Sequence, residues 1–559
     1  MTMTDDGRLY RFGIDDRAGW LLGLQGPQCV AIAVGMFVAG VALNLGAPPL
    51  ATLVPPALSL AVAFAPVAGR PVWAWLPIVT SWQIRRSEHS WRSPLPRFGP
   101  DGTRAASQTL PRILEGVAIV QHQIGWSPRG RSDGTVGVVR DDNDGALTMT
   151  IRVTGQGFAL LERGDQDRLL GGWGDALAGC CRERSPVRSV RWVEWAAPAG
   201  VAEQLDYLER HRAPGASEAA VASYRELLAR SGPVATRHET LVCVTVDPRK
   251  VRVGRSRRAE SPTADGPERN RRDRDGGAFD ALAEEVRLLI ARLEAAGLVV
   301  EGPLGPGELA AVTRSRLDPF SAQGRSADRP SLSHRVGERA GSTVRPIDGP
   351  MATETFWDHV RVDRAFHTSL AITEWPRLDV PANWIEPLLL GGAAIRSVTV
   401  VLEPIPPSRA QRRVDRDSTR LTADAEQRNR SGFRIGARHR RAVTEVAERE
   451  AELVAGYAEF EFSGVITVTA PDLATLDRHA AESEQLAAQA GLNVRRLDGH
   501  SVRLWQCAST RSRPGATCAQ RGSGPHHGRH GLPCKRSAPR LVAMPEQSQR
   551  GDRVPADAR

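Results

Sequence analysis

Lysine is nearly absent from this chain of 559 residues, in which only Lys250 and Lys535 are lysines among 74 basic side chains. A P-loop requires a lysine directly after a glycine, in the pattern G-x-x-x-x-G-K-[ST], because its ammonium group must reach the nucleotide phosphates. Here Arg249 precedes Lys250 and Cys534 precedes Lys535. The sequence therefore excludes a P-loop ATPase.

Cysteine and aromatic residues are also scarce. The seven cysteines are too few to cross-link a chain of this length by disulfide bonds, which argues against a disulfide scaffold and fits a reducing compartment. Aromatic residues make up 5%, so the core must rest mainly on leucine, valine, isoleucine and alanine. With 41% hydrophobic and 25% charged residues, the composition predicts a packed protein of several domains.

The net charge of +10 would by itself suit a nucleic acid or an anionic lipid. However, 64 acidic residues are interleaved with the basic ones, and no long basic block stands alone. We therefore expect no dedicated nucleic-acid footprint. The arginine-rich stretch 254–277 keeps a membrane-tethered DNA-binding adaptor open as an alternative.

Charge is entirely missing between residues 18 and 69. Two apolar runs, 29–45 and 50–67, lie in this window, and Gly46-Ala47-Pro48-Pro49 separates them with residues that end a helix and permit a turn. Each run approaches the ~20 apolar residues that are needed to cross a bilayer. The sequence thus predicts a transmembrane helical hairpin over residues 28–69.

Arginines on both sides of this hairpin predict its orientation. They are Arg8, Arg11 and Arg17 before it and Arg70, Arg85, Arg86, Arg92 and Arg97 after it. Because positive residues stay on the cytoplasmic side, we expect a two-pass protein of the plasma membrane, with the N-terminal segment (1–27) and the C-terminus both cytoplasmic. Trp73, Trp75 and Trp82 are expected at the headgroup level.

Two alternatives to a membrane hairpin fit less well. A cleavable signal peptide should be single and close to the N-terminus, whereas this apolar stretch is double and starts far in. Two buried helices of a soluble protein would rarely leave so long a window without one charge. The hairpin remains the preferred interpretation.

After a juxtamembrane segment (70–112), strands and helices alternate as in an α/β (α+β) protein. In a first α/β module (113–321) we expect strands at 113–124, 135–140, 146–154, 187–195 and 240–246, and helices at 160–179, at 201–230 with a break near Pro214-Gly215, and from Ala278 onward. The polar stretch 254–277 is predicted to be a disordered loop, and a second polar stretch, 322–348, a linker.

The second α/β module (349–499) repeats this order. We expect strands at 368–373, 395–403, 459–469 and 494–497, a short helix at 382–390, a long charged helical hairpin at 407–456 broken near Ser431-Gly432, and a helix at 472–489 capped by Asp472. Two ferredoxin-like modules are the preferred fold for the cytoplasmic body. The pattern collapses in the tail (500–559), which we expect to be disordered or frameshifted.

Two glycine-containing strings resemble catalytic motifs without their context. Gly130-Arg131-Ser132-Asp133-Gly134 matches the nucleophile elbow G-x-S-x-G, which needs a strand before it and a helix after it, whereas here a strand follows. Gly172-Trp173-Gly174 has Leu177 where G-x-G-x-x-G needs its third glycine. We expect a surface turn at the first string and a packing or turn role at the second.

Candidate metal ligands are equally unconvincing. His238-Glu239 has Val242 where a zinc protease needs its second histidine, and in the turn 141–145 a calcium loop would have to begin at Arg140. His359 and His367 are isolated and are expected to be ordinary half-buried histidines. The tail holds Cys507, Cys518, His526, His527, His530 and Cys534, without a C-x-x-C pair or a recognised zinc spacing. We assign no catalytic, cofactor-binding or metal-ligating residue and expect neither a cofactor nor an enzyme.

The charged region 407–456 is the candidate surface for a partner. Arg438, Arg440 and Arg441 form a small basic cluster, and Glu445, Glu448, Glu450 and Glu452 follow at once. A solvated helical hairpin of mixed charge is the simplest interpretation. Docking onto a partner subunit is the other.

Several strings together resemble a known family. Residues 9–69 with Trp75-Leu76-Pro77, and then 356–359 (FWDH), 374–380 (EWPRLDV) and 449–469, are similar to actinobacterial membrane proteins that accompany conjugation ATPases and are described as PrgI-like. The resemblance runs over roughly residues 8–499. Such proteins usually end in an apolar Leu-Pro-Leu segment soon after the position of Gly499, which is absent here.

The resemblance implies a small two-helix inner-membrane subunit of type IV secretion joined to the N-terminal, non-motor domain of the secretion ATPase. It therefore implies a non-enzymatic, membrane-anchored scaffold of a conjugative or type IV-like apparatus that docks a separate ATPase and other subunits in an oligomeric complex. The missing P-loop lysine agrees with this expectation. A component of the type VII secretion membrane complex is the nearest alternative.

Overall fold

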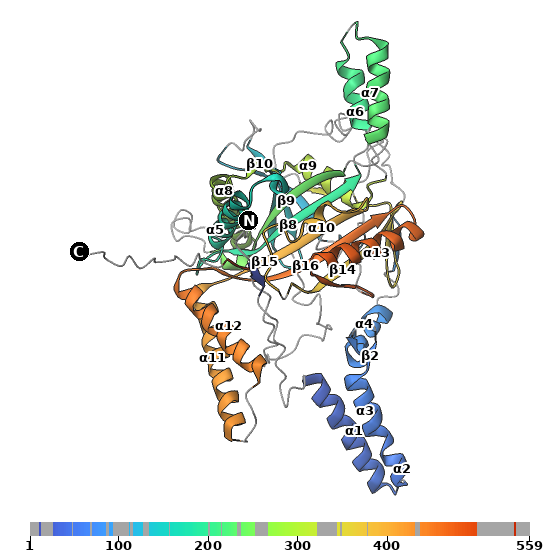
Figure 1. Cartoon of the computed structure of the whole chain (residues 1–559), viewed down its shortest axis with the longest axis vertical. Coiled ribbons are helices and arrows are strands. Elements are labelled where there is room, and N and C mark those ends of the chain that lie inside the picture. Colours follow the sequence, from blue (N-terminus) through green and yellow to red (C-terminus); the bar gives the residue numbers. More distant parts are fainter. Residues whose placement is uncertain are drawn as a thin grey trace, which may run out of the picture.

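The structure is a computed structural model of the whole chain. It describes residues 10–12, 26–46, 48–67, 70–84, 89–92, 111, 114, 116–126, 134–155, 157–198, 202–213, 215–231, 236–251, 267–320, 344–346, 349–376, 378–430, 436–499 and 541–543. A large antiparallel sheet with helices packed against it forms the body, from which helical pairs project (Figure 1). The expected mixed α/β class is confirmed.

The first half of the body contains the predicted strands and helices with shifted ends, and in addition a strand (Val299–Pro303) and a helix (Pro306–Leu317) that were not predicted. They are β5 (Val117–Gln123), β6 (Thr135–Asp141), β7 (Leu147–Thr154), α5 (Arg163–Ala178), β8 (Val187–Pro198), α6 (Ala202–His211), α7 (Glu218–Ser231), β9 (Thr236–Val246), α8 (Pro267–Ala295), β10 (Val299–Pro303) and α9 (Pro306–Leu317). The disordered loop expected at 254–277 is wrong in its second part, because α8 already begins at Pro267; residues 252–266 lie outside the described residues.

The second half likewise contains the predicted elements, and in addition two short strands (Ala352–Thr355 and Val360–Val362) that were not predicted. Its elements are β12 (Ala352–Thr355), β13 (Val360–Val362), β14 (Ala365–Glu374), α10 (Glu386–Leu390), β15 (Ile395–Ile405), α11 (Pro407–Arg430), α12 (Ala437–Val454), β16 (Glu459–Ala470), α13 (Leu473–Gln489) and β17 (Asn493–Arg496). Asp472 caps α13 as expected, since its side chain accepts a hydrogen bond from the N–H of Thr475 at 2.9 Å.

The two halves have the same topology. In the first, β7-α5-β8-β9-α8-β10 builds a sheet of order β10-β7-β9-β8; in the second, β14-α10-β15-β16-α13-β17 builds the order β17-β14-β16-β15. All of these neighbours pair antiparallel. A helical pair occupies the same connection in each half: α6–α7 joins β8 to β9, and α11–α12 joins β15 to β16.

The halves are joined edge to edge into one sheet of 14 strands. β8 and β15 pair antiparallel from Val190↔Leu402 to Ala196↔Arg396. Each would otherwise be an edge strand with unsatisfied backbone groups, so their pairing removes two exposed edges. The expected linker 322–348 also contributes a strand to the sheet, because β11 (Val344–Pro346) within it pairs with β5. The rest of this stretch lies outside the described residues.

The core lies on both faces of this sheet. Successive side chains of a strand point to opposite faces, and in β8 Val190 and Trp192 face α5, α8, α10 and α13, whereas Val193 faces α9. α8 packs Leu282, Val286, Leu289 and Leu293 against the face of the sheet to which Val190 points. Each of these residues is at most 1% exposed, as the 3.6-residue periodicity of α8 predicts.

The N-terminal helices extend away from the body (Figure 1). The remaining elements are β1 (Tyr10–Phe12), α1 (Gly26–Asn44), α2 (Pro49–Thr52), α3 (Val54–Phe64), β2 (Pro66–Val67), β3 (Arg70–Pro71), α4 (Val72–Ile84), β4 (Ser90–Arg92) and β18 (Leu541–Ala543). β4 pairs with β12, and β18 pairs with β1. Part of the tail expected to be disordered is therefore a strand; 500–540 and 544–559 lie outside the described residues.

Candidate interaction surfaces

α1 carries its hydrophobic side chains on the outside. Val34 is 56% exposed and Phe37 is 72% exposed. The 19 residues of α1 span about 28 Å, close to the ~30 Å of a hydrocarbon core. Among the described helices, α1 alone is both long and apolar enough to cross a membrane.

The helix that returns from α1 is shorter than the predicted second span (50–67). Its apolar residues, 50–64, cover about 22 Å, which is less than the ~30 Å of the hydrocarbon core. α1 and α3 nevertheless pack as a pair (Figure 1). Gly35 lies at their contact, where a Cβ atom would lie 2.5 Å from the Cβ of Ser59. Length alone thus supports one crossing, and the second stays a prediction.

α4 joins the apolar helices to the body through an aromatic cluster. The ring of Trp357, between β12 and β13, stacks on Trp75 with centroids 6.2 Å apart and meets Trp82 edge-on at 5.4 Å. Ile78 of α4 is buried beside it, and the N–H of Gly499 donates to the carbonyl oxygen of Trp357 at 2.7 Å. Trp75 and Trp82, expected at the headgroup level, thus contact the body.

Replacing Trp357 by alanine is expected to loosen this joint without unfolding the sheet. The variant loses both aromatic contacts, each worth about 1 kcal/mol beyond the buried area. We expect trypsin to cleave after Arg85 and Arg86, between α4 and β4, several-fold faster in Trp357→Ala. Trp357→Phe keeps a ring in place and is expected to be cleaved at nearly the wild-type rate. Equal rates for all three proteins would contradict this account of the joint.

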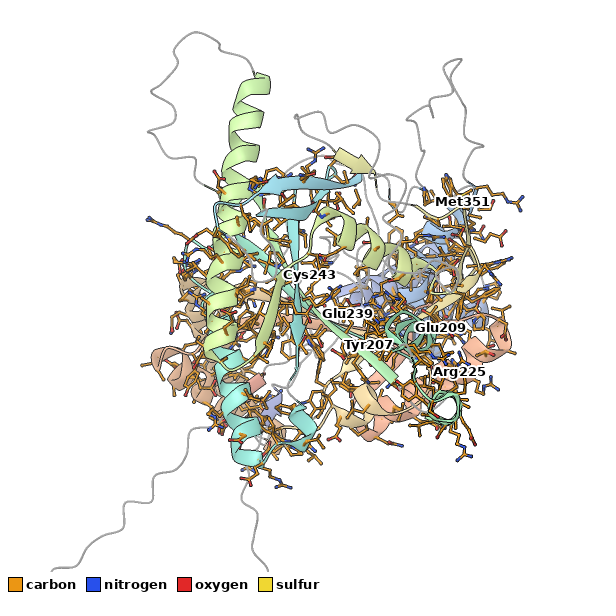
Figure 2. All side chains as sticks on the ribbon, turned by 90° about the horizontal axis from the view of Figure 1, so that it is seen from above. Tyr207, Glu209, Arg225, Glu239, Cys243 and Met351 are labelled. Atoms are coloured by element: carbon orange, nitrogen blue, oxygen red, sulfur yellow. The ribbon has the colours of Figure 1, made fainter. Side chains whose placement is uncertain are left out.

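The α6–α7 hairpin projects from the end of the body opposite to α1 (Figure 1). Glu209 of α6 accepts a hydrogen bond from Arg225 of α7 at 2.7 Å, which ties the two helices together (Figure 2). Tyr207 stacks on His211 with centroids 4.1 Å apart but stays 61% exposed, and Leu227 is 59% exposed. Exposed apolar side chains along a projecting arm are typical of a surface that contacts another protein.

The α11–α12 hairpin leaves the body on the same side as α1 (Figure 1). Its base is fixed by ion pairs: Arg449 of α12 pairs with Glu459 at the start of β16 and lies 3.4 Å from Asp417 of α11. Arg413 pairs with Glu461 at 3.4 Å. The predicted charged hairpin is therefore confirmed as two helices with an ion-paired base.

α9 lies on the other face of the sheet and clamps the two halves together. Leu309 is buried against the first half, and Leu317 is buried with Val360 and Val362 of the second. The carbonyl oxygen of Leu317 accepts a hydrogen bond from His367 Nε2 at 3.0 Å. Sequence reasoning missed this helix.

Asp363, in the β13–β14 turn, gives α9 a second contact with the second half. Arg314 of α9 donates to its Oδ2 at 2.7 Å, and the N–H groups of Met351 and Ala352 donate to its Oδ1 at 2.7 and 2.8 Å. Asp363 has a φ of 51°, in the left-handed region that asparagine and aspartate tolerate best after glycine.

Asp363→Val is expected to destabilise the protein by at least about 2 kcal/mol, because it strands a half-buried Arg314 and puts a β-branched residue at positive φ. Asp363→Asn keeps the shape, the tolerated φ and an acceptor for the two N–H groups, so we expect a loss of about 1 kcal/mol. Chemical denaturation followed by tryptophan fluorescence measures both. A valine variant as stable as the asparagine variant would contradict the proposed strain.

A charged network holds α9 to the first half. Arg316 of α9 pairs with Glu239 of β9 and lies over the ring of Trp195, 3.7 Å from its centroid. Arg152 of β7 pairs with the same carboxylate at 2.9 Å. Burial lowers the pKa of Arg316 to about 10, and Glu239 opposes this shift, so the guanidinium stays charged at neutral pH. The charged groups of this network pair with one another, and the network serves to fix α9.

The structure also places the residues of the rejected motifs. His238 and Glu239 point to opposite faces of the sheet, so they cannot share a ligand: His238 Nδ1 lies 3.2 Å from Glu194, whereas Glu239 faces α9. Gly172 lies inside α5, where a Cβ atom would come within 2.6 Å of Ala296, which confirms its packing role. His359 and His367, which are 7% and 1% exposed, are buried rather than half-buried.

Other candidate ligands carry no site within the described part of the chain. Cys180 and Cys181 are buried, and burial raises the pKa of their thiols to about 11 and 12, so neither is a reactive thiolate at neutral pH. The described residues hold no group of three or more histidine, cysteine, aspartate or glutamate side chains placed to bind a metal. Residues 130–133 and the cysteines and histidines of the tail lie outside them.

A shallow cavity of about 440 Å³ beside α10, lined by Asn383, Trp384, Glu386, Pro387, Leu390 and Gly391, brings no second titratable group to Glu386. Catalysis by proton transfer usually needs two such groups with separated pKa values. The exposed helical pairs are therefore the more informative surfaces. No family model and no curated protein matches this chain.

Proposed function

We propose that this chain is a non-enzymatic, membrane-anchored scaffold component of an actinobacterial conjugative or type IV-like secretion apparatus, which docks a separate secretion ATPase. The observation that carries this proposal is the distribution of exposed surfaces. One end of the molecule presents an apolar helix of membrane length, and the opposite end presents a projecting arm with exposed Tyr207 and Leu227. The family resemblance of the sequence supplies the kind of apparatus.

The anchor is proposed to be a two-pass hairpin in the plasma membrane, with both termini of the chain in the cytoplasm. α1 makes one crossing, and the uncharged stretch from Leu50 to Val67 is proposed to make the return. Arginines flank the hairpin at both ends and are absent from its turn, which supports this orientation.

The body is proposed to consist of two ferredoxin-like modules. The order β-α-β-β-α-β, with the fourth strand beside the first and the third between the first and second, is that of the split βαβ motif. Both halves have this order. Each module carries its helical pair in the connection between the second and third strands, so the paired sheet displays two arms at opposite ends.

The experiment is affinity purification of the full chain from its native host in mild detergent, with mass spectrometry of what accompanies it. A scaffold predicts a conjugation-type ATPase. Because the α6–α7 arm faces away from the membrane, replacing residues 202–231 with a short Gly-Ser linker is expected to remove the ATPase. The matched control replaces α11–α12 (407–454), which fills the same connection in the other half, and is expected to keep it.

The alternatives make different predictions in the same experiment. Type VII secretion subunits in place of a conjugation-type ATPase would favour the type VII membrane complex. No secretion ATPase, with DNA retained at physiological salt, would overturn the scaffold and favour a DNA-binding adaptor. Loss of the ATPase from the α11–α12 variant alone would show that the ATPase docks on α11–α12 and would contradict the proposed docking on α6–α7.

A further inference from the structure

Charge is divided along α12 in the α11–α12 hairpin. The sequence 427–444, of which the last residues of α11 and the first residues of α12 lie at the end far from the sheet, contains six arginines and no aspartate or glutamate. The part of α12 nearer the sheet contains Glu445, Glu448, Glu450 and Glu452 against the single Arg449. A mixed-sign solvated hairpin would not need this separation, so the basic end has to be explained by itself.

The side chains at that end are presented outward. Arg428 and Arg430 end α11, Arg440 and Arg441 lie in the first turns of α12, and all four are exposed. We call these four residues the arginine tip. Arg428 lies 3.0 Å from Asp424 and Arg441 3.2 Å from Glu445, each one turn along its own helix. Exposed pairs of this kind contribute about 0–1 kcal/mol, so an external anion can displace them.

The direction of the hairpin connects the tip with the membrane. In Figure 1 the far ends of α11 and α12 point the same way as α1 and α3; α12 begins near the level at which α1 begins, and α11 ends past that level. α1 begins at Gly26, the end that the flanking arginines place on the cytoplasmic side. If α1 spans the bilayer, the tip therefore lies at its cytoplasmic headgroups.

We propose that the arginine tip is a second membrane contact, which binds the anionic phospholipid headgroups of the leaflet next to α1. It rests on the proposed function only through the insertion of α1. Arginine suits this ligand because its planar guanidinium donates two hydrogen bonds to one phosphate. With α1 and the tip both on the membrane, the body is held at two separated points and the α6–α7 arm is held facing the cytoplasm.

The shape of the hairpin favours a lipid surface over a nucleic acid. A membrane is flat and touches only the end of a projecting hairpin. A duplex long enough to meet several phosphates would also lie against the acidic side chains of α12, beginning at Glu445, which repel it. The α6–α7 arm gives an internal comparison, because its own end mixes Arg210 and Arg212 with Glu209 and Glu218 and points away from α1.

The test uses the full chain, reconstituted in phosphatidylcholine nanodiscs with or without phosphatidylglycerol. Hydrogen exchange is followed in peptides covering 424–430 and 436–445. We expect exchange there to slow at least about tenfold with phosphatidylglycerol, since each arginine near an anionic surface strengthens binding about fivefold. High salt should abolish this protection, because screening weakens the attraction between exposed charges.

Two variants with the same charge change separate the tip from general electrostatics. Arg428→Gln, Arg430→Gln, Arg440→Gln and Arg441→Gln together should remove the protection. Arg210→Gln, Arg212→Gln, Arg225→Gln and Arg230→Gln, on the α6–α7 arm, should leave it intact. Protection that persists in the tip variant, or that disappears equally in both, would overturn the proposal. Protection by a DNA duplex in neutral nanodiscs, with none from phosphatidylglycerol, would assign the tip to nucleic acid instead.

Failure of the anchor is distinguishable from failure of the tip. A chain that does not enter neutral nanodiscs contradicts the insertion of α1, whatever the tip does. The same chain mixed with phosphatidylglycerol vesicles still tests the tip, which predicts salt-sensitive co-flotation that the tip variant loses. A chain that enters neutral nanodiscs but shows no response to phosphatidylglycerol contradicts the tip alone.

Discussion

A chain with Val34→Arg and Val38→Arg is expected to leave the membrane fraction. Both positions lie in the middle of α1, where an arginine costs about 3 kcal/mol on the insertion scale. Two of them cost about 6 kcal/mol together, or roughly a 10⁴-fold shift of the insertion equilibrium. α3 is too short to hold the chain in the bilayer alone, so this is the largest effect we expect from two substitutions.

Flotation in a density gradient at high salt is the suitable measurement, because membranes rise while aggregated protein sinks, and high salt removes the binding of the arginine tip to anionic lipid. The matched control is Val34→Leu with Val38→Leu, which preserves apolar character and should float like the wild type. An arginine variant that floats as completely as the control would show that α1 does not supply the anchor. The exposed α1 would then have to be covered by another protein.

Local patterns predicted most of the elements in the body. The strands β7, β9, β15 and β16 each contain a run of β-branched residues between turn signals, and the apolar spacing of α8 matches its buried face. The prediction failed where polar composition was taken as disorder. α8 starts eleven residues early, at Pro267, because a helix that is held by its C-terminal half can extend into a polar segment.

The features that unite the body could not be predicted in the same way. Pairing of β8 with β15 joins residues about 200 positions apart, and periodicity says which face of a strand is buried, not which strand lies beside it. α9 left a weak local signal: Pro306 at its first turn, then Leu309, Thr313 and Leu317 at four-residue spacing, all buried. The Trp357 joint depends on α4 folding back to the sheet and had no local signal.

The contact between His367 and the end of α9 gives the second large prediction, a loss of stability in acid. His367 is 1% exposed, and its burial lowers the pKa of the imidazole from 6.5 to about 4. A carbonyl oxygen only accepts hydrogen bonds, so Nε2 carries the proton toward Leu317, and Nδ1, 3.0 Å from Thr469 Oγ1, accepts from that hydroxyl. The folded protein therefore holds the neutral imidazole.

Below pH 6.5 the unfolded chain binds a proton at this histidine that the folded chain does not, so stability falls as the pH falls from 6.5 toward about 4. From about pH 7 to about pH 5 we expect a loss of about 2 kcal/mol in the free energy of unfolding from His367.

His367→Gln keeps a donor for Leu317 but cannot titrate, so its stability should fall by about 2 kcal/mol less than that of the wild type over the same pH range. Denaturation midpoints measured across this range give the comparison. His211→Gln, which removes an exposed imidazole on α6, is the matched control and should keep the wild-type slope. If all three proteins lose stability equally in acid, the clamp at His367 is not what acid breaks, and the junction between the halves must be held mainly by β8 and β15.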